Sequence, residues 1–406
     1  MQVYIGIDWS QEKHEIVFHN EDGQMILGMS VEHSMLGLQK IESYRQRLGV
    51  EVEECIVGIE TAHHLLIDFL WKHGYSQIYV LPPNQVRSSQ GRRRQSSARN
   101  DRKDADLIAE ILRTDRHRLY PWHPGSDLLQ QMRAKVSLVR FLTMEVVRTT
   151  NRLRDVLLRY YPAALSIFSG LNTQIALAFI QAYPTPSAAR GLGFASFQEF
   201  AQEQGYRLPK RLPGYFAKLQ QPQPEATPTT VLAFQEEAVL LSSLLSLLVQ
   251  AKAAELRQLQ QLYEQHPDHW IFDSLPMAGT LISAGLLVKF GEDRQRFPSP
   301  QGVQALAGTC PVTNQSGKSH LVRFRKACDK DFRYIVQEWA RATVNESVWA
   351  TNYYLQIRPH SRSDNHAYRC LANRWLAIVW RLWHDHCAYQ ENLHLQRHAS
   401  RCQPRP

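Results

Sequence analysis

Four acidic residues stand where a strand is predicted to end or a helix to begin. Asp8 ends the first alternating apolar run of the chain, and Glu60 ends a second buried run. Asp101 and Asp104 are three residues apart at a predicted helix start, so they share one face. Mg²⁺ prefers carboxylate oxygens from several elements, and two such ions can hold the attacking and leaving oxygens of a phosphodiester. The four acids therefore predict a Mg²⁺ site, although each alone could be a helix cap or a solvated side chain. Asp106 competes for the fourth place but ranks lower, because on an ideal helix it points about 200° away from Asp104.

Ser316 is the second candidate for chemistry, because a serine hydroxyl can act as a nucleophile when a base or a metal activates it. It precedes Gly317 in a polar loop, where a serine is normally a simple turn residue. The chain around and after it carries cations that could hold a scissile phosphate and stabilise developing charge: Lys318, Arg323, Arg325 and Lys326. His320 is the one histidine at a nearby offset, and the sequence does not identify the activating base.

A second group of cations surrounds Asp101 in a segment that is poor in large apolar residues. Such a segment does not suit a core and predicts a loop that lies near phosphates. The group comprises Arg92, Arg93, Arg94, Arg99, Arg102 and Lys103.

Composition narrows the class of protein. The chain has 406 residues, of which 44% are hydrophobic, so it is long enough for two or three folded domains. Its net charge of +9 suits a nucleic-acid partner without requiring one. The six cysteines are scattered with no C-x-x-C pair, which is typical of an intracellular protein. We see neither a signal peptide nor an apolar run of membrane-spanning length, so we expect a cytoplasmic protein with no membrane partner.

The elements that must position these residues fall into three regions. Residues 1–120 read as three antiparallel strands followed by helix–strand units, the order of a ribonuclease-H-like or RuvC-like α/β domain. Residues 121–268 contain two long amphipathic helices, at 127–158 and 230–265, which could pair as a hairpin or dimerise as a coiled coil. Between these helices the chain reads as irregular, with a Pro/Gln-rich linker near 205–230. Residues 269–406 read as mostly helical, including the basic stretch after Ser316.

The motifs resemble those of the DEDD transposases of bacterial insertion sequences, which include the Piv-like DNA invertases and the bridge-RNA-guided serine recombinases. The resemblance covers both ends of the chain and leaves residues 160–230 unmatched. The matching stretches are Ile5-Gly6-Ile7-Asp8, Gly58-Ile59-Glu60-Thr61, Asn100 to Ala105, Leu275 to Gly285, Phe297-Pro298-Ser299, Ala307-Gly308 and Pro311 to Lys318.

The resemblance implies a division of roles. Asp8, Glu60, Asp101 and Asp104 would be the Mg²⁺-binding tetrad of a RuvC-like domain, and Ser316 of a C-terminal transposase domain would form a covalent phosphoserine link with DNA. A structured non-coding guide RNA, the bridge RNA, would pair with donor and target DNA. The chain would act as a homo-oligomer, a dimer of dimers, with its middle helices as the dimerisation coiled coil.

This chain departs from the family pattern in places. The family usually has Pro-Gly-Ile-Gly where this chain has Pro276-Met277-Ala278-Gly279, and it often has two adjacent serines where this chain has Gln315-Ser316. Two other functions therefore stay open. One is a RuvC-like metal-dependent DNA nuclease that uses water as its nucleophile, and the other is a non-catalytic nucleic-acid-binding protein.

Overall fold

The computed structural model forms two compact units, Met1–Pro124 and Gly125–Pro406, and each is considered by itself. The residues that the structure describes are 1–60, 65–89, 100–222, 224, 226–317, 319–393 and 395–396.

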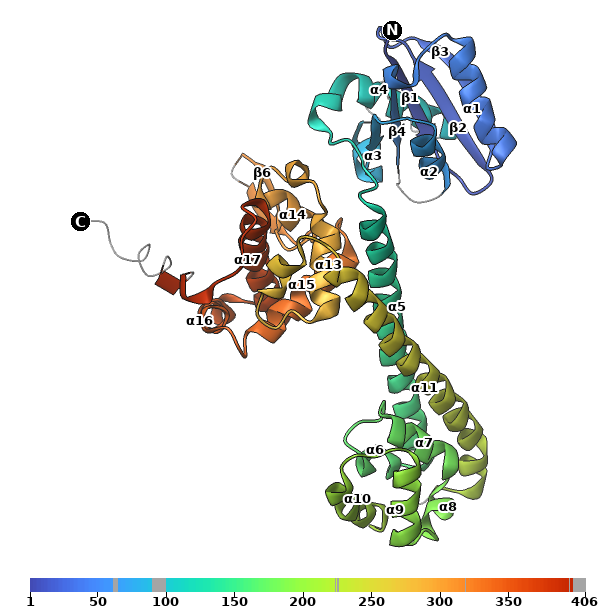
Figure 1. The fold of residues 1–406 in the computed structure, drawn as a ribbon, viewed down its shortest axis with the longest axis vertical. Helices are drawn as coiled ribbons and strands as arrows, with labels where there is room; N and C mark the ends of the chain where they lie inside the picture. The colour runs from blue at the N-terminus through green and yellow to red at the C-terminus, as the bar shows by residue number, and fades with distance from the viewer. Residues whose placement is uncertain are drawn as a thin grey trace, which may run out of the picture. The chain divides into compact units, whose positions relative to one another are not determined.

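The first unit is built on a five-stranded mixed sheet (Figure 1). The strands run in the order β3-β2-β1-β4-β5, with the first three antiparallel and with β4 and β5 parallel to β1. Their bounds are β1 (Val3–Asp8), β2 (Lys13–His19), β3 (Met25–Glu32), β4 (Cys55–Ile59) and β5 (Ile78–Val80). The expected order of three antiparallel strands followed by helix–strand units is confirmed.

Helices cover both faces of this sheet. Alternate residues of β1, such as Ile5 and Ile7, pack with the apolar faces of α1 and α2, while Tyr4 packs on the other face with α4. The alternation read from the sequence therefore reflects two buried faces. The helices are α1 (Met35–Arg47), α2 (Leu65–Lys72), α3 (Pro83–Ser89) and α4 (Asp101–Asp115), with short 3-10 turns η1 (Val52–Glu54) and η3 (Arg116–Arg118).

Two glycines let α4 approach the sheet closely. Gly6 of β1 and Gly58 of β4 are paired in register. A Cβ on Gly6 would lie 2.0 Å from the carbonyl oxygen of Ala105, and one on Gly58 would lie 2.7 Å from Ile108 Cγ2. Because neither residue has a Cβ, α4 packs directly on the backbone of β1, with its first turn near the ends of β1 and β4.

The second unit is organised by two long helices, α5 (Asp127–Tyr160) and α11 (Pro228–Glu264), which pack along each other (Figure 1). Both helices were expected, and their bounds agree with the prediction within two residues. Among the described residues α11 alone is long and apolar enough, by length and composition, to cross a membrane. Core helices of soluble proteins meet the same criterion, and α11 packs against α5 and α7.

Residues 163–220, which read as irregular, instead form a small helical bundle between α5 and α11. Its core gathers aromatic side chains in edge-to-face contact, among them Phe168, Phe179 and Phe197. The linker predicted near 205–230 contains η4 and α10. The bundle elements are α6 (Ala164–Ile167), α7 (Gln174–Ala182), α8 (Pro186–Arg190), α9 (Phe194–Glu203), η4 (Pro209–Arg211) and α10 (Leu212–Leu219).

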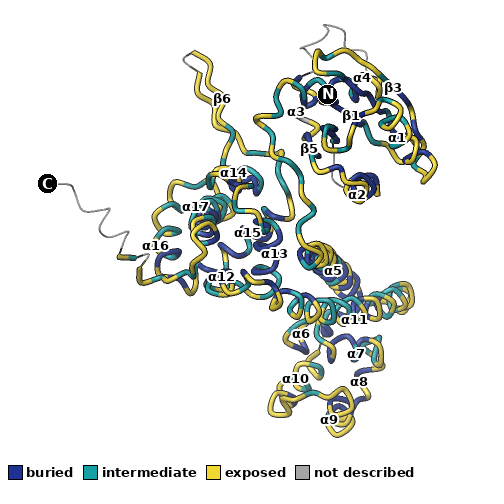
Figure 2. The backbone as a smooth tube through the Cα atoms, turned by 45° about the horizontal axis from the view of Figure 1, so that its top comes forward, coloured by how far each residue is buried: buried dark blue, intermediate teal, exposed yellow. Residues whose placement is uncertain are grey.

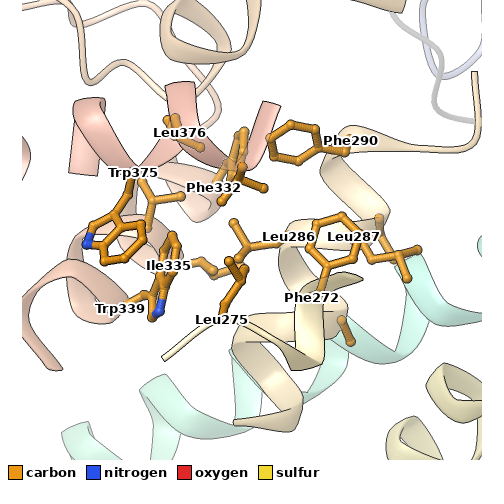
Figure 3. Close-up of a cluster of buried hydrophobic side chains, with 14 of the residues drawn as sticks. Phe272, Leu275, Leu286, Leu287, Phe290, Phe332, Ile335, Trp339, Trp375 and Leu376 are labelled. Carbon is orange, nitrogen blue, oxygen red and sulfur yellow. The ribbon is translucent and has the colours of Figure 1, made fainter. Parts of the chain in front are cut away.

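The remaining chain folds around a tryptophan-rich core (Figure 3). Trp339, Trp375 and Trp383 are fully buried, so they serve packing and are not available to stack on bases. The elements are α12 (His269–Asp273), α13 (Thr280–Phe290), η5 (Arg294–Arg296), α14 (Pro300–Leu306), β6 (Val312–Ser316), β7 (Ser319–Arg323), α15 (Lys330–Thr343), α16 (Val348–Ile357), η6 (Arg358–His360) and α17 (Asp364–His384).

Candidate active site

The first two acids of the candidate site lie at the ends of neighbouring parallel strands. Asp8 is the last residue of β1, and Glu60 directly follows β4. Because Ile7 pairs with Ile59, the two carboxylates leave the sheet side by side. The flanking sequences Ile5-Gly6-Ile7-Asp8 and Val57-Gly58-Ile59-Glu60 repeat one pattern, an apolar residue, a glycine, an isoleucine and an acid. The repeated pattern matches the register in which β1 and β4 pair. It is a signal in the sequence that could have placed the two acids side by side.

The other two acids come from the first turn of α4. Asn100 caps this helix, because its side chain accepts a hydrogen bond from the Arg102 amide at 2.9 Å. Asp104 is half-buried and Asp101 is exposed. Asp106, the weaker candidate for the fourth acid, interacts with a histidine instead: its Oδ1 lies 2.8 Å from Nε2 of the buried His19.

The Asp8 carboxyl lies in an electrostatically unfavourable place. Its pKa is raised to about 7, mainly by burial and in addition by the negative charges of Glu60, Asp101 and Asp104, with a smaller contribution from Glu15. The four predicted acids therefore act on one another electrostatically around Asp8. A structure that gathers several carboxylates at one place is stabilised when a cation neutralises them.

The donor set fits Mg²⁺, because every candidate ligand is a carboxylate oxygen and comes from one of three elements, β1, the end of β4 and α4. Within the described part of the chain, no three acidic, histidine or cysteine side chains are yet grouped closely enough to hold one ion. An ion at Asp8 would therefore require the four acids to come closer together.

The cations predicted to bind nucleic acid near these acids are described only in part. Arg92, Arg93, Arg94 and Arg99 lie outside the described residues. Arg102 and Lys103 are exposed on the first turn of α4. The Arg102 guanidinium lies over β3, where a Cβ on Gly28 would be 2.1 Å from Arg102 Nη2.

Ser316 ends a strand and does not lie in a loop. β6 and β7 form an isolated antiparallel hairpin whose strand residues after Val312 are all exposed (Figure 2). Ser316 pairs with Ser319, so these two hydroxyls share a face of the hairpin. Gly317, which begins the turn, has a positive φ of 54°. Lys318 lies outside the described residues.

The alternation of the hairpin also sorts the neighbours of Ser316. Arg323 lies on the same face as Ser319, four pairs further from the turn. His320 pairs with Gln315, so it lies on the opposite face and is poorly placed to serve as the base for Ser316. A base for Ser316 is therefore not identified among these neighbours.

The basic stretch from Arg323 to Arg333 was predicted to be helical. This is confirmed for Lys330 and Arg333, which lie in α15, and is wrong for the residues before them. Arg323 ends β7, and Arg325 and Lys326 lie in the connection to α15. The Arg325 Nε donates a hydrogen bond to the carbonyl oxygen of Cys310 at 3.4 Å, which ties together the two ends of the hairpin. Arg323 and Lys326 are exposed.

A mixed α/β unit with four electrostatically interacting carboxylates, continued by a mostly helical unit with an exposed hairpin and cations at its base, has the features of an enzyme that acts on nucleic acid. Two family models match the chain. One, described as a transposase of the DEDD IS110 type, covers residues 5–162, and another, described as the IS116/IS110/IS902 transposase family, covers residues 270–355. The chain belongs to this family of insertion-sequence transposases.

Individual relatives agree with this assignment. A Streptomyces coelicolor mini-circle protein assigned as the transposase for IS117 is 27% identical, over 93% of this chain and 92% of its own length. The 42 kDa protein of insertion element IS900 from Mycobacterium paratuberculosis is 25% identical, over 95% of this chain and 97% of its own length. The 43.6 kDa protein of insertion element IS110 from Streptomyces coelicolor is 26% identical over 73% of each chain.

Proposed function

We propose that this transposase is an RNA-guided recombinase that cuts and rejoins donor and target DNA through a covalent phosphoserine at Ser316. The observation that carries the proposal is the convergence of Asp8, Glu60, Asp101 and Asp104 around the end of β1. All four acids fall within the first family match, and Ser316 falls within the second. Each match thus contributes one part of the proposed chemistry.

The N-terminal unit would serve as a RuvC-like domain, which the strand order β3-β2-β1-β4-β5 and the place of the acids support. Asp8, Glu60, Asp101 and Asp104 would hold Mg²⁺. When bound, the metal would neutralise charge on the phosphate oxygens and position the DNA. The close packing of α4 on Gly6 supports this role, because it fixes the position of the helix that carries two of the four proposed ligands.

At Ser316 the reaction would exchange one phosphodiester for another. The Oγ of Ser316 would bond to phosphorus while the bond to the bridging oxygen breaks, and the departing DNA oxygen would take up a proton. A hydroxyl from the exchanged strand would then attack the phosphoserine and restore the free Ser316. Arg323 shares the Ser316 face of the hairpin, and Arg325 and Lys326 follow it, so their charges would attract the DNA backbone at the base of the hairpin, away from the phosphate that Ser316 attacks.

The decisive experiment compares Ser316→Ala with Ser319→Ala in the full chain. These serines are paired across the hairpin, share one face and are both exposed, so the second variant is a matched control. We expect Ser316→Ala to abolish the protease-sensitive protein–DNA adduct and all strand exchange, and Ser319→Ala to retain both. DNA cleavage that persists in Ser316→Ala without an adduct would instead establish the nuclease that uses water.

The acids need their own test. Asp8→Asn keeps the shape of the side chain and removes its charge, so we expect it to abolish strand exchange. Recombination at the wild-type level in Asp8→Asn would contradict the metal-binding role and favour a protein whose acids are structural.

The proposed partners are donor and target DNA, a structured guide RNA and further copies of the chain, acting in the cytoplasm. Exposed apolar residues on the outer faces of α5 and α11 support self-association of the long helices, among them Phe141, Leu240 and Leu247. Guidance by RNA is tested by treating the purified protein with ribonuclease. Recombination that proceeds equally well after this treatment would eliminate the guide RNA from the mechanism.

A further inference from the structure

Phe324 directly follows β7, at the base of the hairpin that carries Ser316. The Arg333 guanidinium of α15 lies 4.7 Å from the centre of its ring, and that of Arg369 on α17 lies 4.6 Å from it. The ring is 46% exposed, so it belongs to the surface and not to the tryptophan core. One aromatic side chain thus holds two cations from two helices that are far apart in sequence.

The charge gathered at this ring is not compensated by the described carboxylates. Arg333 donates from Nη1 to the carbonyl oxygen of Arg325 at 3.0 Å, which uses one N–H of its guanidinium and no acid. In the described chain no ion pair joins a carboxylate to Arg333 or to Arg369. Burial lowers the pKa of Arg369, and the charge of Arg333 lowers it further. Burial also lowers the pKa of nearby His366, with added effects from Arg369 and Arg362.

Other arginines on the same helices are neutralised in the usual way. Arg341 of α15 pairs with Glu338 at 2.6 Å, one turn before it. Arg381 of α17 pairs with Asp385, four residues later. The helices therefore have acidic partners for exposed arginines elsewhere, while Arg333 and Arg369 both lie against the Phe324 ring and pair with no carboxylate of the described chain. A local excess of positive charge held at fixed geometry is suited to a polyanion.

We propose that Arg333 and Arg369, held by Phe324, form a binding site for the phosphodiester backbone of a nucleic acid at the base of the Ser316 hairpin. The proposal rests on the proposed function, in which this hairpin meets DNA. The five residues of β7 span about 17 Å at ~3.4 Å per residue. One strand of a duplex carries a phosphate about every 3.4 Å along its axis, so the site would bind the backbone about five nucleotides from the phosphate that Ser316 attacks.

The site would also position the hairpin. Arg333 contacts both Phe324 and the backbone of Arg325, so it links α15 to the segment that leaves β7. A phosphate between the two guanidiniums would relieve their repulsion, and the cations would then hold Phe324 more firmly. Binding of the backbone at this site would therefore steady the strand that leads to Ser316.

The test measures the salt dependence of nucleic-acid binding by the full chain, with a duplex DNA and with a single-stranded RNA as separate probes. Arg369→Gln is the main variant, because Arg369 makes no hydrogen bond to the hairpin among the described residues. Arg381→Gln, on the same helix but already paired with Asp385, is the matched control. Each phosphate contact contributes about 0.9 to the slope of log K against log salt concentration for duplex DNA and about 0.7 for a single strand.

We expect Arg369→Gln to reduce this slope by about 1 and to weaken binding several-fold at low salt. Arg369→Lys should restore most of the slope, because it keeps the charge, and Arg381→Gln should leave the slope unchanged. A reduced slope with DNA or with RNA supports the site and identifies which backbone occupies it. Unchanged slopes with both probes would overturn the proposal, even if Arg369→Gln lowers thermal stability. The binding assay needs no catalysis, so an adduct that persists in Ser316→Ala would defeat the proposed function without altering this result.

Discussion

Asp8 and Ser316 each end a β-strand, yet the two strands differ in almost every other respect. β1 is the central strand of a five-stranded sheet, is paired on both sides and is covered by helices on both faces. β6 pairs with β7 alone, and its residues after Val312 are exposed. Two-stranded hairpins on their own are at best marginally stable in water. The acids are therefore placed by a folded core, whereas the serine is placed by a ribbon fixed mainly at its base.

This difference suggests how the proposed chemistry is divided. The carboxylates around Asp8 repel one another, so they stay near one another only if a rigid scaffold holds them. The close packing of α4 on β1 provides this scaffold. Ser316 has no such charge to restrain, and an exposed hairpin can adjust to a DNA strand as it docks. The contacts of Phe324 fix the position of the base of the hairpin, and bound substrate would fix the position of its tip.

The largest effect should come from Gly6→Ala. The added Cβ would lie 2.0 Å from the Ala105 carbonyl oxygen and 2.5 Å from the Ala109 nitrogen, both of which are backbone atoms that cannot turn away. We expect the N-terminal unit to lose about 3 kcal/mol of stability or more, at or beyond the usual cost of overpacking. Displacing α4 also displaces Asp101 and Asp104, and a shift of about 1 Å can reduce a rate by about 100-fold. Calorimetric unfolding and a strand-exchange assay measure the two effects.

Two other glycines serve as controls, and substituting either should cost less stability than Gly6→Ala. Gly58→Ala meets only the flexible side chains of Ile108 and Leu112, so its cost should be smaller than that of Gly6→Ala. Gly191→Ala in the helical bundle meets nothing within 4 Å and has an ordinary φ, so it should change stability by no more than about 1 kcal/mol. If Gly6→Ala were as mild as Gly191→Ala, the close packing of α4 on β1 would not be what places the acids.

A smaller effect should appear in the pH dependence of stability. The pKa of Asp8 is raised from its ordinary 3.8 to about 7 in the folded chain, because burial and neighbouring negative charges disfavour the carboxylate. The stabilising contribution of protonated Asp8 is therefore full below about pH 4 and is lost as the pH rises through about 7. Asp8→Asn removes this dependence. In calorimetry with chelator, wild type should lose more stability than Asp8→Asn between pH 5 and pH 8.

Mg²⁺ extends the same comparison. At pH 8, added Mg²⁺ should raise the unfolding temperature of wild type and leave that of Asp8→Asn nearly unchanged, because a ligand that binds only the folded state stabilises it. An equal response of the two proteins would place Mg²⁺ binding elsewhere in the chain. Equal pH profiles would show that the Asp8 carboxyl is not perturbed as its surroundings imply.

The contrast between β1 and β6 also explains which parts of the structure were accessible from the sequence. A strand with buried faces records its burial in apolar alternation, so β1, β4 and their terminal acids could be predicted from residues 3–8 and 54–60. β6 and β7 have no buried face and therefore no alternation to detect, and Arg323 at the end of β7 was mistaken for part of a helix. The helices of the bundle are 4 to 10 residues long, too short for a 3.6-residue period to stand out among prolines and glycines.

Packing partners were the other part that the sequence did not supply. The sequence could assign each of the four acids to a strand end or a helix start. Whether the other acids influence Asp8 depends on how closely α4 approaches Gly6, which the sequence does not show. Likewise, Arg325 could be recognised as basic, but its hydrogen bond to Cys310 depends on where the chain crosses itself. The pairing of Phe324 with Arg333 and Arg369 joins three elements and leaves no local pattern in the sequence.

The smallest expected change in the unfolding temperature is that of Gly317→Ala at the turn beside Ser316. Gly317 has a φ of +54°, and an added Cβ would meet nothing within 4 Å, so the only penalty is the left-handed backbone, about 1–2 kcal/mol for an L-residue. Because the hairpin is exposed, this strain should loosen the turn locally and leave the unfolding temperature of the full chain unchanged. Strand exchange should fall several-fold, since Ser316 directly precedes the altered residue. Gly317→Asn should retain more activity, because asparagine tolerates this backbone region better. A loss of global stability as large as that of Gly6→Ala would mean that the hairpin is built into the core of its unit, and the contrast between the two strands would fail.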